Sequence, residues 1–218
     1  MVMHTEMPRP PSRRAKPLSM KPMPRNLEVG PEDVIDGTRR QLDRLASVDS
    51  RRRTLESLTR CLGVTGGGWI SEHRRALREL LCSTGLEAIG PVLAEVERAP
   101  RAEVIEDAAN VLAKLSDRAG ALAALGDELR GRGDWSRRMT AVQAVGAMLG
   151  PEGRDVRRAL LIEALADRDA DIRDAAAQGL INLEDPAVCD ALRSALATEQ
   201  VDFVRASIEE ALGELSRL

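Results

Sequence analysis

The sequence predicts an all-α protein, a right-handed α-solenoid of about five to six antiparallel helix pairs. Composition is the first reason: only 1% of the 218 residues are aromatic, whereas Ala, Leu, Glu and Arg, which favour helices, are plentiful. The second reason is a repeat, because the stretches RRMTAVQAVGAML, DIRDAAAQGLINL and FVRASIEEALGEL share one pattern. Self-similarity at a period of about 20 to 50 residues is typical of helical repeat arrays.

The three stretches align on Arg138, Arg173 and Arg205, which are 35 and 32 residues apart. Small or apolar residues follow each arginine at the third, sixth, seventh and tenth positions, a spacing that places them on one helix face. A single helix pair cannot bury such a stripe by itself. Stacked pairs are therefore expected to share a continuous core.

Residues 1–30 differ from the rest and are expected to form a disordered basic arm. Six of the eleven prolines and five of the seven methionines lie in residues 1–25, and proline prevents a regular helix there. These residues carry a charge of +5, and because the whole chain carries −3, the remainder carries −8. Arg13, Arg14 and Lys16 are candidate partner-binding residues in this arm.

The solenoid is expected over residues 31–218, with an irregular helical cap at 31–84 and regular repeats at 86–218. Pro31 and the two acidic residues after it predict the first helix, because proline suits a first turn and acids stabilise a helix N-terminus. The Gly-rich stretch at 63–68 predicts a flexible hinge. The expected helices are a pair at 31–46 and 50–63, a single helix at 69–83, and four cleaner pairs at 86–98 with 102–115, 119–132 with 136–149, 153–166 with 170–184, and 187–197 with 202–217.

Residues 167–196 resemble HEAT-like repeats of the phycobilisome-lyase type. That type combines an Asp-containing turn, an apolar residue followed by arginine, and an alanine-rich second helix. The matching residues are Asp169 or Asp171 with Ile172-Arg173, Asp202 with Val204-Arg205, and, less well, Asp134 with Arg137-Arg138.

The resemblance covers residues 119–217 well and 86–118 less well, because Ile105 occupies the arginine position there. It implies that Asp and Arg of successive repeats bridge the layers, which gives Arg173 and Arg205 a structural role. The resemblance is specific for the fold and says little about function.

The sequence predicts a protein that is not an enzyme and needs no cofactor or metal. General acid–base catalysis needs groups within hydrogen-bond reach, but histidine occurs only at His4 and His73. The three cysteines lack the spacing of a zinc site, and the Gly-rich stretch matches neither phosphate-binding motif. Two HEAT-like enzyme classes remain as alternatives, the DNA alkylpurine glycosylases and the bilin lyases.

A partner surface is expected on the second helix of each pair, where the positions outside the core are mostly acidic or polar. Arg138 and Gln143 stand in the middle of this strip, and Trp135 is either a partner anchor or a residue that packs in its turn. The strip is either an ordinary solvated surface or an acidic groove for a basic segment, such as the arm itself. Its other members are Glu106, Asp107, Asn110, Asp174, Gln178, Asn182, Glu210 and Glu214.

The expected function is a non-catalytic scaffold, adaptor or regulatory subunit that binds another protein in a bacterial cytoplasmic assembly. Reduced cysteines suit the cytoplasm, the scarcity of lysine beside arginine suggests a GC-rich bacterial genome, and no apolar run approaches the 18 residues of a membrane span. The alternative is a nucleic-acid-associated protein that uses the basic arm. The acidic body argues against it, because phosphate binding needs clustered basic residues.

Overall fold

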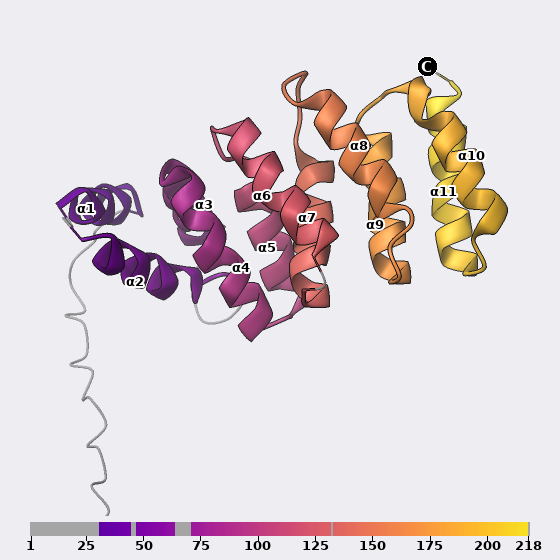
Figure 1. Cartoon of the computed structure of the whole chain (residues 1–218). Coiled ribbons are helices and arrows are strands. Elements are labelled where there is room, and N and C mark those ends of the chain that lie inside the picture. The colour runs from indigo at the N-terminus through magenta and orange to yellow at the C-terminus, as the bar shows by residue number, and fades with distance from the viewer. Residues whose placement is uncertain (1–30, 45–46, 64–70, 132, 218) are drawn as a thin grey trace, which may run out of the picture.

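The computed structural model describes residues 31–44, 47–63, 71–131 and 133–217, in which all long elements are helices (Figure 1). The predicted arm, with Arg13, Arg14 and Lys16, lies outside the described residues. Each predicted helix is present, with ends within four residues of those expected. The helices are α1 Pro31–Arg44, α2 Val48–Thr59, α3 Ser71–Ser83, α4 Ile89–Arg98, α5 Ala102–Leu112, α6 Arg118–Arg130, α7 Trp135–Ala147, α8 Arg154–Ala164, α9 Ala170–Ile181, α10 Cys189–Thr198 and α11 Asp202–Leu215, with short 3-10 turns at Gly85–Ala88 and Pro186–Val188.

The helices stack in layers along one direction, which confirms the predicted solenoid (Figure 1). The second helices α5, α7, α9 and α11 form one row in which each packs against the next. Each of them also packs against its own first helix, α4, α6, α8 or α10. The result is four regular layers, in the part of the chain where the repeat was predicted most clearly.

The N-terminal helices are paired differently from the prediction. The expected first pair was 31–46 with 50–63, but α1 packs mainly on α3 and α2 packs mainly on α4. The row of second helices thus continues backward through α3 to α1. The repeat pattern is absent from this part of the sequence, so spacing alone could not show which helices are neighbours.

The predicted apolar stripes form the core. In α9, Ile172, Ala176 and Leu180 are completely buried, and Ala141 of α7 and Ile208 of α11, at the position of Ala176, are buried as well. One cluster of buried side chains runs from Leu42 in α1 to Leu215 in α11. Neighbouring layers therefore stabilise one another through a shared core, as expected for a repeat array.

Two glycines set the closest approach between layers. A Cβ atom built on Gly146 of α7 would lie 2.8 Å from the Cα atom of Gly179 in α9. A Cβ on Gly179 would lie 3.0 Å from Leu161 and 3.1 Å from the Cα atom of Gly146. Side chains at either position would force α7 and α9 apart.

The repeated arginines join each layer to the next. The Arg173 Nη1 atom donates to the Asp167 carbonyl in its own turn at 2.9 Å, and its Nε atom donates to the Glu199 carboxylate of the next turn at 2.6 Å. Arg138 likewise donates from its Nη1 atom to the Gly133 carbonyl of its own turn at 2.8 Å, and from its Nε atom to the Asp167 carboxylate of the next turn at 3.2 Å. The bridging expected for Arg173 is confirmed, although its acceptor is a glutamate.

Arg205 departs from that expectation. Its Nη1 atom donates to the carbonyl oxygens of Leu196 and Glu199, at 3.2 and 3.0 Å, both within its own layer. Since α11 belongs to the last described layer, no described turn follows it to supply a carboxylate.

The turn aspartates stabilise the helix starts. Asp134 accepts a hydrogen bond from the Ser136 N–H at 2.7 Å, and Asp169 accepts one from the Asp171 N–H at 3.0 Å. These bonds satisfy backbone donors that the first turn of a helix leaves unpaired. Hydrogen bonds from Ser136 also hold the pKa of Asp134 below its usual value. Asp134 and Asp169 of the sequence pattern are thus helix caps, whereas Asp202 is the first residue of α11 and makes no cap bond.

Candidate functional site

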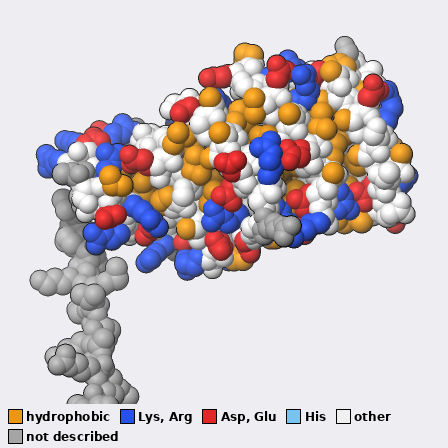
Figure 2. Space-filling view, viewed as in Figure 1, with side chains coloured by type: hydrophobic (Ala, Val, Ile, Leu, Met, Phe, Trp, Pro, Cys, Tyr) orange, Lys and Arg blue, Asp and Glu red, His pale blue; other side chains and the backbone are white. Residues whose placement is uncertain are grey.

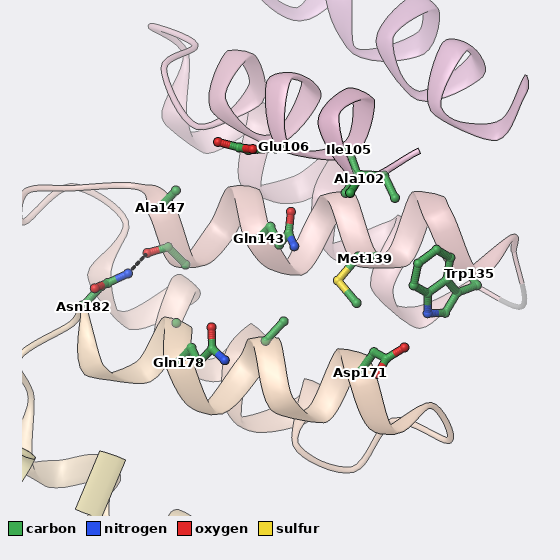
Figure 3. A pocket seen from close by; sticks show the side chains of 13 residues that line it. Ala102, Ile105, Glu106, Trp135, Met139, Gln143, Ala147, Asp171, Gln178 and Asn182 are labelled. Carbon is green, nitrogen blue, oxygen red and sulfur yellow. Dashed lines mark hydrogen bonds between the residues drawn. The ribbon is translucent and has the colours of Figure 1, made fainter. Parts of the chain in front are cut away.

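A groove of about 550 Å³ crosses the row of second helices at α5, α7 and α9 (Figure 3). All three helices contribute to its wall, so the groove exists only because successive layers are stacked. We call it the α5–α7–α9 groove. It is lined by Ala102, Ile105, Glu106, Trp135, Met139, Gln143, Gly146, Ala147, Asp171, Ala175, Gln178, Gly179 and Asn182.

The floor of the groove is apolar. The side chains of Ile105 and Met139 are only 4% and 6% exposed, respectively, and are part of the common core. Gly146 and Gly179 add no side chain where α7 and α9 meet, so the groove stays open between the two helices. Such a floor can bury apolar side chains of an occupant.

Two carboxamides stand above this floor. Gln143 and Gln178 each lie five residues after the repeat arginine of their helix, so they occupy equivalent places in successive layers, and both are exposed. The Gln178 Nε2 atom donates to Asp174 at 2.9 Å, whereas Gln143 makes no hydrogen bond within the described part of the chain. A carboxamide both donates and accepts, so this pair matches the needs of a peptide backbone.

The fifth position after the repeat arginine is also polar in the neighbouring layers. In α5 it is Asn110, whose Nδ2 atom donates to the Glu106 carbonyl at 3.0 Å, and in α11 it is the exposed Glu210. The three carboxamides form a row across α5, α7 and α9, which we call the carboxamide row: Asn110, Gln143 and Gln178.

The charges in the groove are negative. Glu106 and Asp171 are exposed acids on its wall, and no arginine or lysine lines it. Figure 3 shows Glu106, Gln143 and Gln178 along one side, with Trp135 and Asp171 toward the other. A positively charged occupant would find acids on two different helices.

Trp135 both packs against the core and lines the groove, and its role as a partner anchor stays a prediction. It is the first residue of α7, it is half-buried against the common core, and its indole also lines the groove beside Met139 (Figure 3). Toward the other end of the groove, the Asn182 Nδ2 atom donates to the Gly146 carbonyl at 3.1 Å (Figure 3). That bond ties the last turn of α7 to α9.

The structure brings five of the predicted partner-binding residues into one groove: Glu106, Trp135, Gln143, Gln178 and Asn182. Asn110 lies one turn beyond Glu106 on α5. Asp174 is turned toward α11, where it accepts a hydrogen bond from the Ser207 hydroxyl. Whether these residues bind a partner remains a prediction.

Two members of the predicted strip are buried. Arg138 is only 3% exposed and bridges two layers, so it is part of the scaffold. Asp107 is 2% exposed and binds Arg74, Arg78 and the Gly63 N–H, each at 2.8 to 2.9 Å. Sequence spacing placed both on the surface, because it could not show which polar residues find partners in the adjacent layer.

The groove floor was not predicted as part of the site. The repeat pattern places Ile105 at the arginine position of its helix and does not single out Met139, yet both are core residues that form the floor. The same pattern indicates Asp171 only as a turn residue. The register of the repeat could have indicated Met139, because it follows the repeat arginine directly and precedes Gln143 by one helical turn.

The described residues contain no group of three or more His, Cys, Asp and Glu side chains that could hold a metal ion. Among the same residues, no helix is both long and apolar enough to span a bilayer.

Comparison with known proteins identifies the repeat type in the C-terminal part. Residues 122–213 match the family model of HEAT repeats, which agrees with the expected HEAT-like repeat. No curated protein matches the chain.

Two solved structures share the helical layout. An engineered protein is 18% identical, with a TM-score of 0.46, and the match covers 84% of this chain and 97% of that one. The HEAT-like repeats protein of the archaeon Thermococcus onnurineus NA1 is 14% identical, with a TM-score of 0.43, over 85% and 80% of the two chains. At these values neither structure bears on what this chain binds.

Proposed function

We propose that this protein is a non-catalytic interaction module whose α5–α7–α9 groove binds a basic, partly apolar segment of another protein. The observation that carries the proposal is the groove itself, with its apolar floor, two equivalent carboxamides and acids on two helices. Solenoids present extended surfaces for partners, and HEAT repeats over 122–213 support that type of role.

The chemistry of the groove disfavours the alternatives. A nucleic-acid surface needs clustered arginine or lysine, but the groove lining has neither, and acidic and basic side chains are interspersed on the face shown in Figure 2. For a HEAT-like enzyme, the groove offers two exposed acids on different helices and no histidine or cysteine. We therefore assign the groove to binding, within an adaptor or regulatory subunit of a bacterial cytoplasmic assembly.

The phycobilisome-lyase subtype of the repeats stays part of this proposal. It rests on the alternation of turn aspartate, apolar-Arg step and alanine-rich helix at 167–196. The subtype concerns the repeat and does not imply bilin attachment.

The test is affinity purification from the source organism with a tagged full chain, followed by mass spectrometry. The groove variant carries Gln143→Ala and Gln178→Ala, which remove both carboxamides without touching the buried floor. The matched control carries Asp127→Ala and Ser194→Ala, at exposed positions of the first helices α6 and α10. We expect a partner that is captured by the wild type and the control and lost from the groove variant. Equal capture by all three proteins would refute the assignment.

A further inference from the structure

The carboxamide row suits an extended occupant. Asn110, Gln143 and Gln178 present one carboxamide on each of three successive helices of the row. A polyproline II segment is extended, with three residues per turn and a rise of about 3.1 Å per residue. Its backbone makes no internal hydrogen bonds and is free to bond with the amides.

The rest of the groove also suits such a segment. Aromatic side chains dock proline-rich segments in several binding domains, and here Trp135 lies beside the apolar Met139. Glu106 on α5 and Asp171 on α9 supply negative charge on either side of α7. The expected occupant is therefore rich in proline and positively charged, with some apolar side chains.

The chain contains a segment with this composition. Residues 1–25 hold six prolines, five methionines and six basic residues against one acid, for a charge of +5. Arg13 and Lys16 are three residues apart, so in a polyproline II conformation they project from the same side. The segment complements the groove in charge and in apolar content.

The segment is long enough to reach the groove of its own chain. The described chain begins at α1, which packs on α3, which packs on α5, which packs on α7. Three helix spacings amount to about 30 Å. The 30 residues before α1 can span up to ~100 Å when extended.

We propose that residues 1–25 occupy the α5–α7–α9 groove of their own chain in a polyproline II conformation, as an intramolecular competitor of the partner. This inference rests on the proposed function, because it takes the same groove as the binding site. A partner then has to displace the arm, so changes in the arm regulate access to the groove.

Site-specific photocrosslinking in the full chain tests the docking. A p-benzoylphenylalanine residue replaces the exposed Ala147, which lines the groove outside the carboxamide row, and in the control it replaces the exposed Asp127 of α6. After irradiation, peptide mass spectrometry locates the crosslinks in the single-chain band. We expect crosslinks from position 147 into residues 1–25 and none from position 127.

Two changes separate specific docking from random collision. Crosslinking should be largely lost when Arg13→Gln, Arg14→Gln and Lys16→Gln are combined, and also at about 1 M salt, where the screening length falls to ~3 Å. Pro10→Ala with Pro11→Ala should reduce it through loss of the preformed conformation.

The proposal is overturned if position 147 gives no crosslink to residues 1–25, if position 127 gives as many, or if the crosslinks join two chains. Crosslinks that persist in the triple glutamine variant would also overturn it. Partner capture is measured separately. A partner lost from the Gln143→Ala, Gln178→Ala protein while the arm gives no crosslinks would remove the arm from the groove and leave the proposed function intact.

Discussion

At the scale of single residues, the bridge from Arg173 to Glu199 joins two layers. The Arg173 guanidinium donates to both carboxylate oxygens, at 2.6 and 2.9 Å, and the Gln200 and Val201 N–H groups each donate at 2.9 Å. These bonds, led by those from Arg173, lower the pKa of Glu199 to about 2. The ionised carboxylate is therefore held far better in the folded state than in the unfolded chain.

This bridge predicts a stability that depends on pH. Unfolded glutamate titrates near pH ~4.3, so the stabilisation is fully present above that pH and is lost as the pH falls toward 2. Glu199→Gln should lower the free energy of unfolding by about 2–3 kcal/mol at pH 7, and by roughly half as much at pH 3. Urea titrations at both pH values measure the difference. The control is Glu210→Gln, at an exposed position that makes no hydrogen bond or ion pair within the described part of the chain. An equal loss of stability from Glu199→Gln at both pH values would refute the account.

Replacing a glycine by alanine should change the stability of the protein in opposite directions at a close helix contact and at an open position. Gly146→Ala should destabilise the protein by about 1–3 kcal/mol, because the new Cβ would meet Gly179 at 2.8 Å and overpack the interface. Gly213→Ala in α11 should stabilise it by up to ~1 kcal/mol, since its Cβ meets nothing within 4 Å and alanine favours helix. Chemical denaturation of both variants is the measurement. An increase in stability from Gly146→Ala would show that α7 and α9 have room for a side chain between Gly146 and Gly179.

At the scale of helices, α11 differs from the other second helices on its outer side. The fourth residue after the repeat arginine is Val142 in α7 and Ala177 in α9, both completely buried against the next layer. In α11 that residue is Glu209, which is exposed. A polar outer face is characteristic of terminal repeats, which must not associate with further layers.

Glu209→Leu should therefore promote self-association. The substitution restores an apolar residue to the position that inner layers bury, in a helix whose Phe203 is already 49% exposed. Light scattering across a range of concentrations should show a larger increase of mass for Glu209→Leu than for the wild type. Glu210→Leu also adds an exposed leucine, but on the side of the carboxamide row, and should behave like the wild type. Similar masses for both variants would argue against a capping role of Glu209.

The helices themselves were largely predictable from sequence, for identifiable reasons. The Ile172, Ala176 and Leu180 stripe fixes both the existence of α9 and its buried face, because apolar periodicity is a local property. The pairing of α1 with α3 was not predictable, since it depends on contacts between distant segments that carry no repeat. Likewise, Arg138 and Asp107 look like surface residues in the sequence, and only the adjacent layers show where their charges are neutralised.

At the scale of the whole molecule, stacking creates the site. Glu106, Gln143 and Gln178 are unremarkable on their separate helices and form one surface only when α5, α7 and α9 lie side by side. The sequence indicated Glu106, Gln143, Gln178 and Asn182 as polar positions of the second helices outside the core, but it did not indicate Asp171. It did not predict the apolar floor, because Ile105 and Met139 satisfy the same pattern as ordinary core residues.

The central claim is that the groove holds a basic segment against its carboxamides and acids. The most direct test is the dissociation constant of the captured partner, measured by calorimetry for Ala147→Glu and Ala147→Lys, two changes of opposite charge at one exposed position of the groove that leave both carboxamides in place. We predict that Ala147→Glu tightens binding and Ala147→Lys weakens it, each by about two- to fivefold, as expected for exposed charge pairs. Equal affinities for both variants, or tighter binding by Ala147→Lys, would contradict the claim.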